Sequence, residues 1–121
     1  MRRIITLREA LRDFLRDVGL SLDDILSAMD EDPRGIIESL KMRVDIGEHE
    51  ARRLERALTT RQLNLLIFVI HVFYYANPSG YYKGYLLYPP RELIIGEDGR
   101  VTSKGLSLVL RSLGIMPGAA V

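Results

Sequence analysis

The chain of 121 residues has no cysteine and no tryptophan, and only three of its 17 basic residues are lysines. The absence of cysteine excludes disulfides, thiol chemistry and cysteine-bound metals, and it favours a reducing cytoplasm as the location. The 17 basic residues are balanced by 16 acidic ones, so the formal net charge is +1, without the basic excess typical of nucleic-acid-binding proteins. Dominant arginine and missing cysteine would suit a thermophilic source, but they decide nothing about function.

Long hydrophobic runs are missing too. The most apolar stretch, residues 63–76, contains Asn64 and His71 and is shorter than the roughly 20 residues needed to cross a bilayer. Residues 1–17 carry charges every few positions and lack the apolar core of a signal peptide. We therefore expect a cytoplasmic protein that makes no membrane contact.

Patterns for catalysis and metal binding are also lacking. The histidines, His49 and His71, are isolated, and no HExxH motif or paired ligand accompanies them. The glycines are scattered at predicted turns, and no Ser–His–Asp arrangement can be argued. We expect no enzymatic activity, no cofactor and no metal, and we interpret His71 as a satisfied core or interface histidine.

Capping residues mark the first helix. Thr6 and Glu9 have the spacing of a capping box, and apolar residues follow at helical intervals until Gly19 ends the pattern. These signals predict a helix between Thr6 and Gly19.

The stretch from Ser21 to Leu40 predicts two short helices around an acidic corner. Ser21 caps the first of them, and Asp32 followed by Pro33 starts the second. Residues 30–32 form the corner between them. Two capped helices joined in this way have the shape of a helix-turn-helix.

The rest of the chain predicts two further helices, a hairpin and a last helix. Residues 48–59 form a fourth helix, and residues 61–76 a fifth that is apolar nearly all round. After the turn residues 77–80 come an extended segment at 81–88 and a hairpin at 91–102. Ser103 caps the last helix and Gly114 ends it, before a loose tail at 115–121.

We therefore expect a mainly α fold, in which a helix-turn-helix bundle of four to five helices precedes a β-hairpin and a C-terminal helix. We divide it into a helix-turn-helix domain at 1–61 and a dimerisation or wing-like region at 62–121.

Residues 7–58 resemble the Cro and phage-repressor type of helix-turn-helix domain, found in bacterial and archaeal transcription regulators. The matching features are the helix end at Gly19, the helix opening at 21–25, the isoleucines Ile36 and Ile37, and the ending at 53–58. This family usually has a small residue where Leu26 stands, so the two helices of the corner would cross less closely. More loosely, residues 98–105 resemble the wing and following helix of winged-helix regulators.

The resemblance implies that the third helix docks in the major groove of double-stranded DNA, with a homodimer reading two half-sites. The outward residues of the third and fourth helices would then contact DNA, and we identify them as Arg34, Glu38, Lys41, Arg43, Arg52, Arg53 and Arg56. The alternative interpretation is that these residues form a solvated, charged helix surface without a DNA contact.

The fifth helix has more apolar surface than one bundle obviously covers, which favours a role in dimerisation. The predicted interface residues are Leu66, Val69, Ile70, Phe73 and Tyr74. The tyrosines at 74, 75, 81, 82, 85 and 88 are interpreted as a dimer or core-edge cluster.

A second hypothesis remains open. The acidic corner at 30–32 would lie beside phosphates, and residues 1–61 hold 12 basic and 13 acidic residues. The chain is then a non-enzymatic protein-interaction module, or adaptor, that retains a helix-turn-helix fold without binding DNA.

Overall fold

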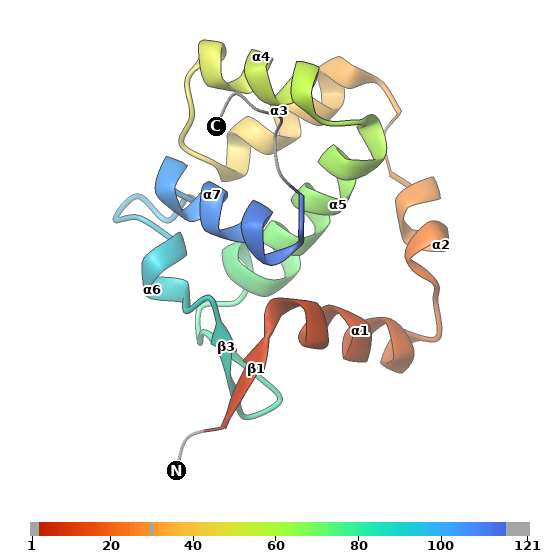
Figure 1. The fold of residues 1–121 in the computed structure, drawn as a ribbon, viewed down its shortest axis with the longest axis vertical. Helices are drawn as coiled ribbons and strands as arrows, with labels where there is room; N and C mark the ends of the chain where they lie inside the picture. Colours follow the sequence, from red (N-terminus) through yellow and green to blue (C-terminus); the bar gives the residue numbers. More distant parts are fainter. Residues whose placement is uncertain (1–2, 30, 116–121) are drawn as a thin grey trace.

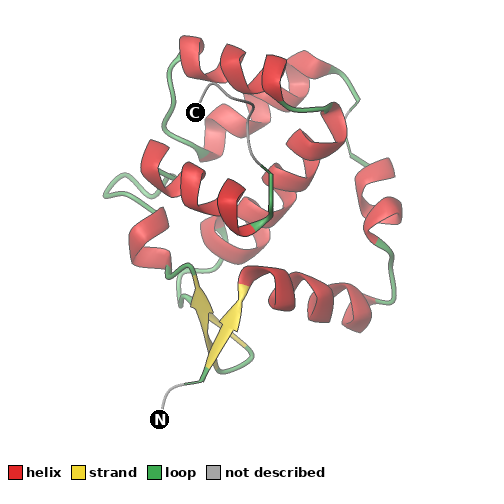
Figure 2. Cartoon of the chain, viewed as in Figure 1, coloured by secondary structure: helices red, strands yellow, loops and turns green. Residues whose placement is uncertain are grey.

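The computed structural model describes residues 3–29 and 31–115. Its helices are α1 (Leu7–Val18), α2 (Leu22–Ser27), α3 (Pro33–Arg43), α4 (Glu48–Ala57), α5 (Thr60–Ile70), the π-helical η1 (His71–Tyr75), α6 (Arg91–Ile94) and α7 (Ser103–Ser112). Its strands are β1 (Ile4–Thr6), β2 (Tyr81–Tyr82) and β3 (Tyr85–Tyr88). The fold is mainly helical with one small sheet, as predicted (Figure 1, Figure 2).

The predicted helix starts are confirmed where a side chain caps the backbone. Both capping boxes form, Thr6 with Glu9 and Ser21 with Asp24, and Asp32 caps α3 before Pro33. The last helix differs by one residue, because its cap is the side chain of Thr102 and not that of Ser103.

Helix α5 is the centre of the bundle. It packs against α3, α2 and α7, and it leads directly into the π-helical turn η1 (Figure 1). Because α5 is surrounded on several sides, its apolar surface belongs to the core of the single chain. That core contains residues from both sides of the predicted domain boundary at 61.

The side chains predicted as a dimer interface, on α5 and η1, lie instead in the core of the single chain. Every one of these side chains is at most 1% exposed in the chain alone, and none is accessible to a second copy: Leu66, Val69, Ile70, Phe73 and Tyr74. The sequence pattern correctly indicated a helix that is apolar nearly all round. The error lay in underestimating how much of it α2, α3, α7 and the sheet cover.

The sheet joins the start of the described chain to residues 81–88. Its strand order is β1-β3-β2, with β1 parallel and β2 antiparallel to the central β3. Strand β1 was not predicted. Lys83 and Gly84 make the tight turn between β2 and β3, and both have positive φ, 50° and 84°, as a two-residue hairpin loop requires.

The hairpin predicted at 91–102 forms only in part. Its first residues form the single helical turn α6, and the hairpin is reduced to a short antiparallel pairing around the predicted turn at 96–99. There Ile95 bridges Val101, the Gly96 amide donates to the Arg100 carbonyl at 2.8 Å, and the Thr102 amide donates to the Ile94 carbonyl at 3.0 Å. Val101 also bridges Val44 at the end of α3. The segment at 81–88, predicted only as extended, forms a second hairpin.

Gly105 explains how closely α7 approaches α6. A Cβ atom there would lie 2.4 Å from the carbonyl oxygen of Ile94 and 2.7 Å from its Cα. Only glycine therefore allows the two backbones to touch at this point. Within the described ranges, no helix has both the length and the apolar character required to span a membrane.

Candidate interaction surfaces

The corner between α2 and α3 is held by α5. Helix α2 packs mainly on α5, and α3 packs mainly on α5 and α4. Leu26, which replaces the small residue usual in the resembled family, is buried at 6% exposure. The outward side of α3 lies next to α4, at the end of the molecule farthest from the sheet (Figure 1).

Lys41 lies on this side but is engaged by acidic neighbours. Its Nζ forms an ion pair with Glu48 of α4 and lies 3.9 Å from Oε1 of Glu38. Glu48 in turn lies 3.8 Å from Nε of Arg52. The hydrogen bond with Glu48 raises the pKa of Lys41 and lowers that of the glutamate, so both stay charged and neutralise each other.

Arg43 is turned away from the predicted DNA-binding surface. Its Nη1 donates to the carbonyl oxygen and to Oγ of Ser39, both at 2.9 Å, and its Nε donates to Nδ1 of His71 at 3.2 Å. The guanidinium also lies 5.8 Å from the ring centre of Tyr75. Burial, followed by the charge of Arg43, lowers the pKa of His71, which favours the neutral ring that accepts this hydrogen bond.

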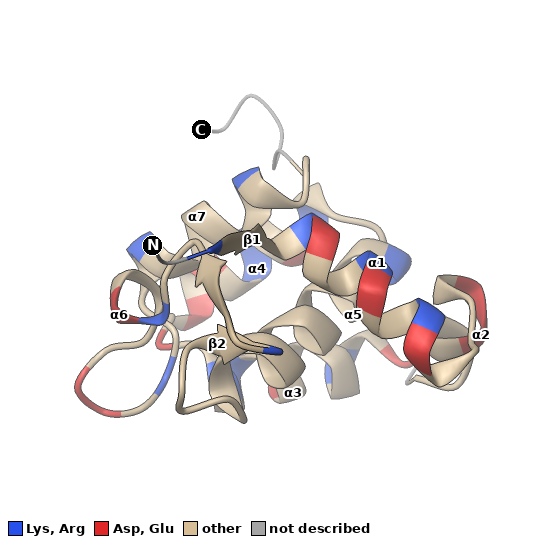
Figure 3. Cartoon of the chain, turned by 90° about the horizontal axis from the view of Figure 1, so that it is seen from below, with Lys and Arg blue, Asp and Glu red and all other residues tan. Residues whose placement is uncertain are grey.

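The remaining predicted residues, Arg34, Glu38, Arg52, Arg53 and Arg56, are exposed on α3 and α4. Between Glu31 and Leu58, six basic residues are accompanied by seven acidic ones. Basic and acidic residues also alternate along the ribbon of α1 (Figure 3). The structure thus places the predicted residues on two neighbouring helices, where acidic residues are as numerous as basic ones.

The sheet carries apolar side chains on both of its faces. Register pairs Ile4 with Leu86, Thr6 with Tyr88, and Tyr81 with Leu86, so these five side chains share one face. We call this the outer sheet face: Ile4, Thr6, Tyr81, Leu86 and Tyr88. Exposure is 60% at Ile4 and 57% at Tyr88, so this face lies open in the described chain.

The inner sheet face lies against the core and is fastened to α1. Leu87 is fully buried, and the Tyr82 ring lies 5.7 Å from that of Phe73. The Tyr82 hydroxyl donates to Oδ2 of Asp13 at 2.8 Å, and Lys83 forms an ion pair with the same carboxylate at 2.8 Å. Burial and the bond to Asp13 raise the pKa of Tyr82 to about 12.

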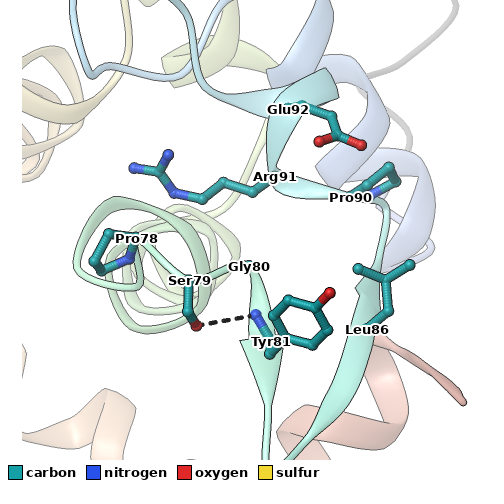
Figure 4. Close-up of a pocket in the computed structure, with 8 residues that line it drawn as sticks. All are labelled: Pro78, Ser79, Gly80, Tyr81, Leu86, Pro90, Arg91 and Glu92. Atoms are coloured by element: carbon teal, nitrogen blue, oxygen red, sulfur yellow. Dashed lines mark hydrogen bonds between the residues drawn. The ribbon is translucent and has the colours of Figure 1, made fainter. Parts of the chain in front are cut away.

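A pocket of about 230 Å³ borders the outer sheet face (Figure 4). Its walls are formed by Pro78, Ser79, Gly80, Tyr81, Leu86, Pro90, Arg91 and Glu92. Arg91 is held in place because its Nε donates to the carbonyl oxygen of Tyr74 at 3.2 Å. Tyr81 and Leu86 belong to both the pocket and the outer sheet face, so the two form one continuous surface.

The outer edge of β2 is occupied by side chains of the preceding loop. The Tyr81 amide donates to Oγ of Ser79 at 3.1 Å, and its carbonyl accepts from Nδ2 of Asn77 at 3.1 Å. This edge is therefore closed to an additional strand.

A second hollow, of about 290 Å³, lies between α1, α5 and the end of α7. It is lined by Arg8, Leu11, Arg12, Leu15, Leu65 and Leu113. In the part of the chain that the structure describes, no three His, Cys, Asp or Glu side chains gather as a metal site.

Sequence reasoning missed the outer sheet face as a surface. The tyrosine cluster was its only signal, and the structure divides that cluster. Tyr74 is in the core, Tyr82 and Tyr85 are on the inner face, and Tyr81 and Tyr88 are on the outer one. Comparisons of the chain with protein families, curated proteins and solved structures find no match.

Proposed function

We propose that the chain is a non-enzymatic protein-interaction module that keeps a helix-turn-helix-like order of helices without reading DNA through α3. The observation that carries this proposal is the engagement of Lys41 by Glu48 and of Arg43 by Ser39 and His71. DNA affinity comes largely from basic side chains that neutralise phosphates. On α3, two of the three basic side chains are already used within the chain.

The outer sheet face supports the other part of the proposal, namely that the chain binds proteins. Solvated sheet faces normally carry polar residues, whereas four of the five side chains here are aliphatic or aromatic. Exposed apolar patches of this kind mark interaction sites. The lack of cysteine supports a cytoplasmic location, where a protein does not depend on disulfides.

The test is binding of the full chain to a mixed-sequence DNA duplex at low and moderate salt. We expect binding that is weak and equal in the wild type and in Arg34→Ala plus Lys41→Ala. The matched control is Arg8→Ala plus Arg12→Ala, which removes the same charge from α1. Salt-dependent binding that only the α3 variant weakens would contradict the proposal.

One observation favours DNA binding as a second candidate function. Arg52, Arg53 and Arg56 are all exposed on α4, and Arg34 is exposed at the start of α3. Such an arrangement would contact phosphates and position a dimer of the chain without specifying a sequence. In that case Arg53→Ala plus Arg56→Ala would weaken binding to every duplex alike and reduce its salt dependence.

A further inference from the structure

We propose that the hollow between α1, α5 and the end of α7 binds an amphipathic helix of a partner protein, whose polar flank is acidic. The inference rests on the proposed function, because it names the kind of partner that the interaction module takes. We call this site the α1 hollow. It has a volume of about 290 Å³, and its lining is Arg8, Leu11, Arg12, Leu15, Leu65 and Leu113.

Four leucines from three segments give the α1 hollow an apolar lining. Leu11 and Leu15 lie one turn apart on α1, Leu65 belongs to α5, and Leu113 directly follows α7. All four are only partly buried within the chain. Apolar side chains of a partner would remove their remaining surface from water, which is the main favourable contribution to most protein association.

Arg8 and Arg12 add positive charge to the same site. Both are exposed, and among residues 3–29 and 31–115 neither side chain takes part in a hydrogen bond or an ion pair. Helices α5 and α7, which supply the other walls, contain no acidic residue. The charge of the two arginines is therefore left for a partner to neutralise.

The acidic residues of α1 are used elsewhere in the chain. Asp13 and Asp17 both form ion pairs with Lys83 of the β2–β3 turn. Glu9 accepts hydrogen bonds from the amide and the hydroxyl of Thr6, at 3.0 and 2.8 Å. Basic and acidic residues thus alternate along α1 but lie on different sides of it, and the basic side borders the hollow. Acidic residues of a partner complement this side, whereas basic ones would be repelled.

The spacing of the lining favours a helix as the partner segment. Arg8 with Arg12, and Leu11 with Leu15, form two neighbouring rows in which the interval is four residues. A helix that lies along α1 presents its own side chains at the same interval. One apolar row of that helix enters the hollow, while the adjacent acidic row meets the arginines.

A small amphiphilic molecule fits the site less well. Pockets for small molecules have volumes of roughly 300–1,000 Å³ and bury most of the ligand surface. The α1 hollow has about 290 Å³, its leucines are all partly exposed, and its arginines are exposed. It can therefore receive apolar side chains of a helix but is too open to enclose an alkyl carboxylate.

The experiment is a fluorescence-anisotropy titration of the full chain against two labelled peptides. Each is an alanine-based helix of about 18 residues, long enough to be helical when isolated, with leucines along one side. Glutamates flank the leucines in the Glu peptide, and lysines replace these glutamates in the Lys peptide. At low salt we expect the Glu peptide to bind at least about tenfold more tightly, with an affinity that falls as salt is added.

Arg8→Glu plus Arg12→Glu tests the charge of the site. This variant should reverse the preference and bind the Lys peptide more tightly than the Glu peptide. A chain that merely failed to fold would lose both peptides, so the reversal separates loss of contact from loss of fold. The matched control is Arg52→Glu plus Arg56→Glu, which makes the same change at two exposed positions one turn apart on α4 and should keep the wild-type preference.

The apolar contribution is tested on the peptide, so that the chain itself is unchanged. Replacement of the leucines of the Glu peptide by glutamines should weaken binding at least about tenfold, because the four leucines of the hollow then stay in contact with water. Binding that survives this replacement would mean that the charges act without the hollow and would contradict the inference.

Three further results would overturn it: no binding of the Glu peptide, equal binding of the Glu and Lys peptides, or a preference that the α1 variant leaves unchanged. Binding of dodecanoate without binding of the Glu peptide would also overturn it, because the hollow would then be a site for a small amphiphile. Each of these results leaves the proposed function intact. Salt-dependent DNA binding through α3 would reject the proposed function without changing the peptide titration.

Discussion

The two faces of the three-stranded sheet differ in what they contact, although the same strands supply both. On the inner face Leu87 is fully buried and Tyr82 is bonded to Asp13 of α1. On the outer face Ile4 is 60% exposed and contributes little to the core. The inner face therefore explains why the sheet is stable, whereas the apolar character of the outer face has to be explained by something outside the fold.

The largest expected effect on stability is at Leu87, and the adjacent Leu86 provides the comparison. Leu87→Ala should lower the free energy of unfolding by about 3 kcal/mol, because it removes a fully buried side chain and leaves a cavity. Leu86→Ala, the same change on the outer face, should lower it by less than half as much. Urea unfolding of both variants measures the two losses of unfolding free energy. Equal losses would contradict the expected difference between the two faces.

A smaller effect is expected at the loop that closes the edge of β2. Nδ2 of Asn77 donates to the carbonyl oxygens of Phe73 and Tyr81, each at 3.1 Å. Asn77→Ala leaves the end of η1 without this donor and should destabilise the fold by about 1–2 kcal/mol. Ser79→Ala is compared in the same thermal unfolding experiment, because it keeps the Asn77 amide donor and removes instead the hydroxyl that donates to Oδ1 of Asn77 and accepts from the Tyr81 amide.

The contact between the inner face and α1 should depend on pH. Hydrogen bonds from Lys83 and Tyr82 hold the pKa of Asp13 below its ordinary value of 3.8. The stabilisation is therefore present above that ordinary value and is lost as the pH falls through the lower folded value.

We expect Asp13→Asn to be less stable than the wild type at neutral pH and the difference to shrink on acidification, with a size below that of Leu87→Ala. Thermal unfolding across the acid range measures it. Comparison with Glu55→Gln, at an exposed position of α4, controls for general loss of negative charge. A gap between Asp13→Asn and the wild type that stays constant with pH would contradict the expectation.

The smallest expected effect is on the outer face. Ile4→Thr replaces an exposed β-branched residue by another, so the unfolding free energy of dilute protein should change by no more than about 0.5 kcal/mol. Urea unfolding of the dilute wild-type and variant proteins measures this change. A loss as large as that for Leu87→Ala would mean that the outer face also serves the fold of the single chain.

Much of the helical half could be predicted because its signals are local. The caps at Thr6, Ser21 and Asp32 each need only a side chain and the next turn of backbone, and all three form as expected. The positive φ of Gly19 and Gly114 likewise follows from their positions at helix ends. Such features do not depend on the rest of the fold.

The sheet and the candidate surface depended on contacts between distant residues. Strand β1 is three residues long and pairs with β3, whose residues lie about 80 positions away, so nothing near Ile4 indicates a strand. The outer face follows only from this register. The hydrogen bond from Arg43 to His71 could not be predicted from the sequence either, because it joins α3 to a π-helical turn across 28 positions.

Thr6 has a mechanical consequence for a partner seated on the sheet. It is the last residue of β1, and its side chain caps α1 by accepting the amide hydrogen of Glu9 at 3.2 Å. No linker separates the strand from the helix. A displacement of β1 by a bound partner would therefore also displace the first turn of α1.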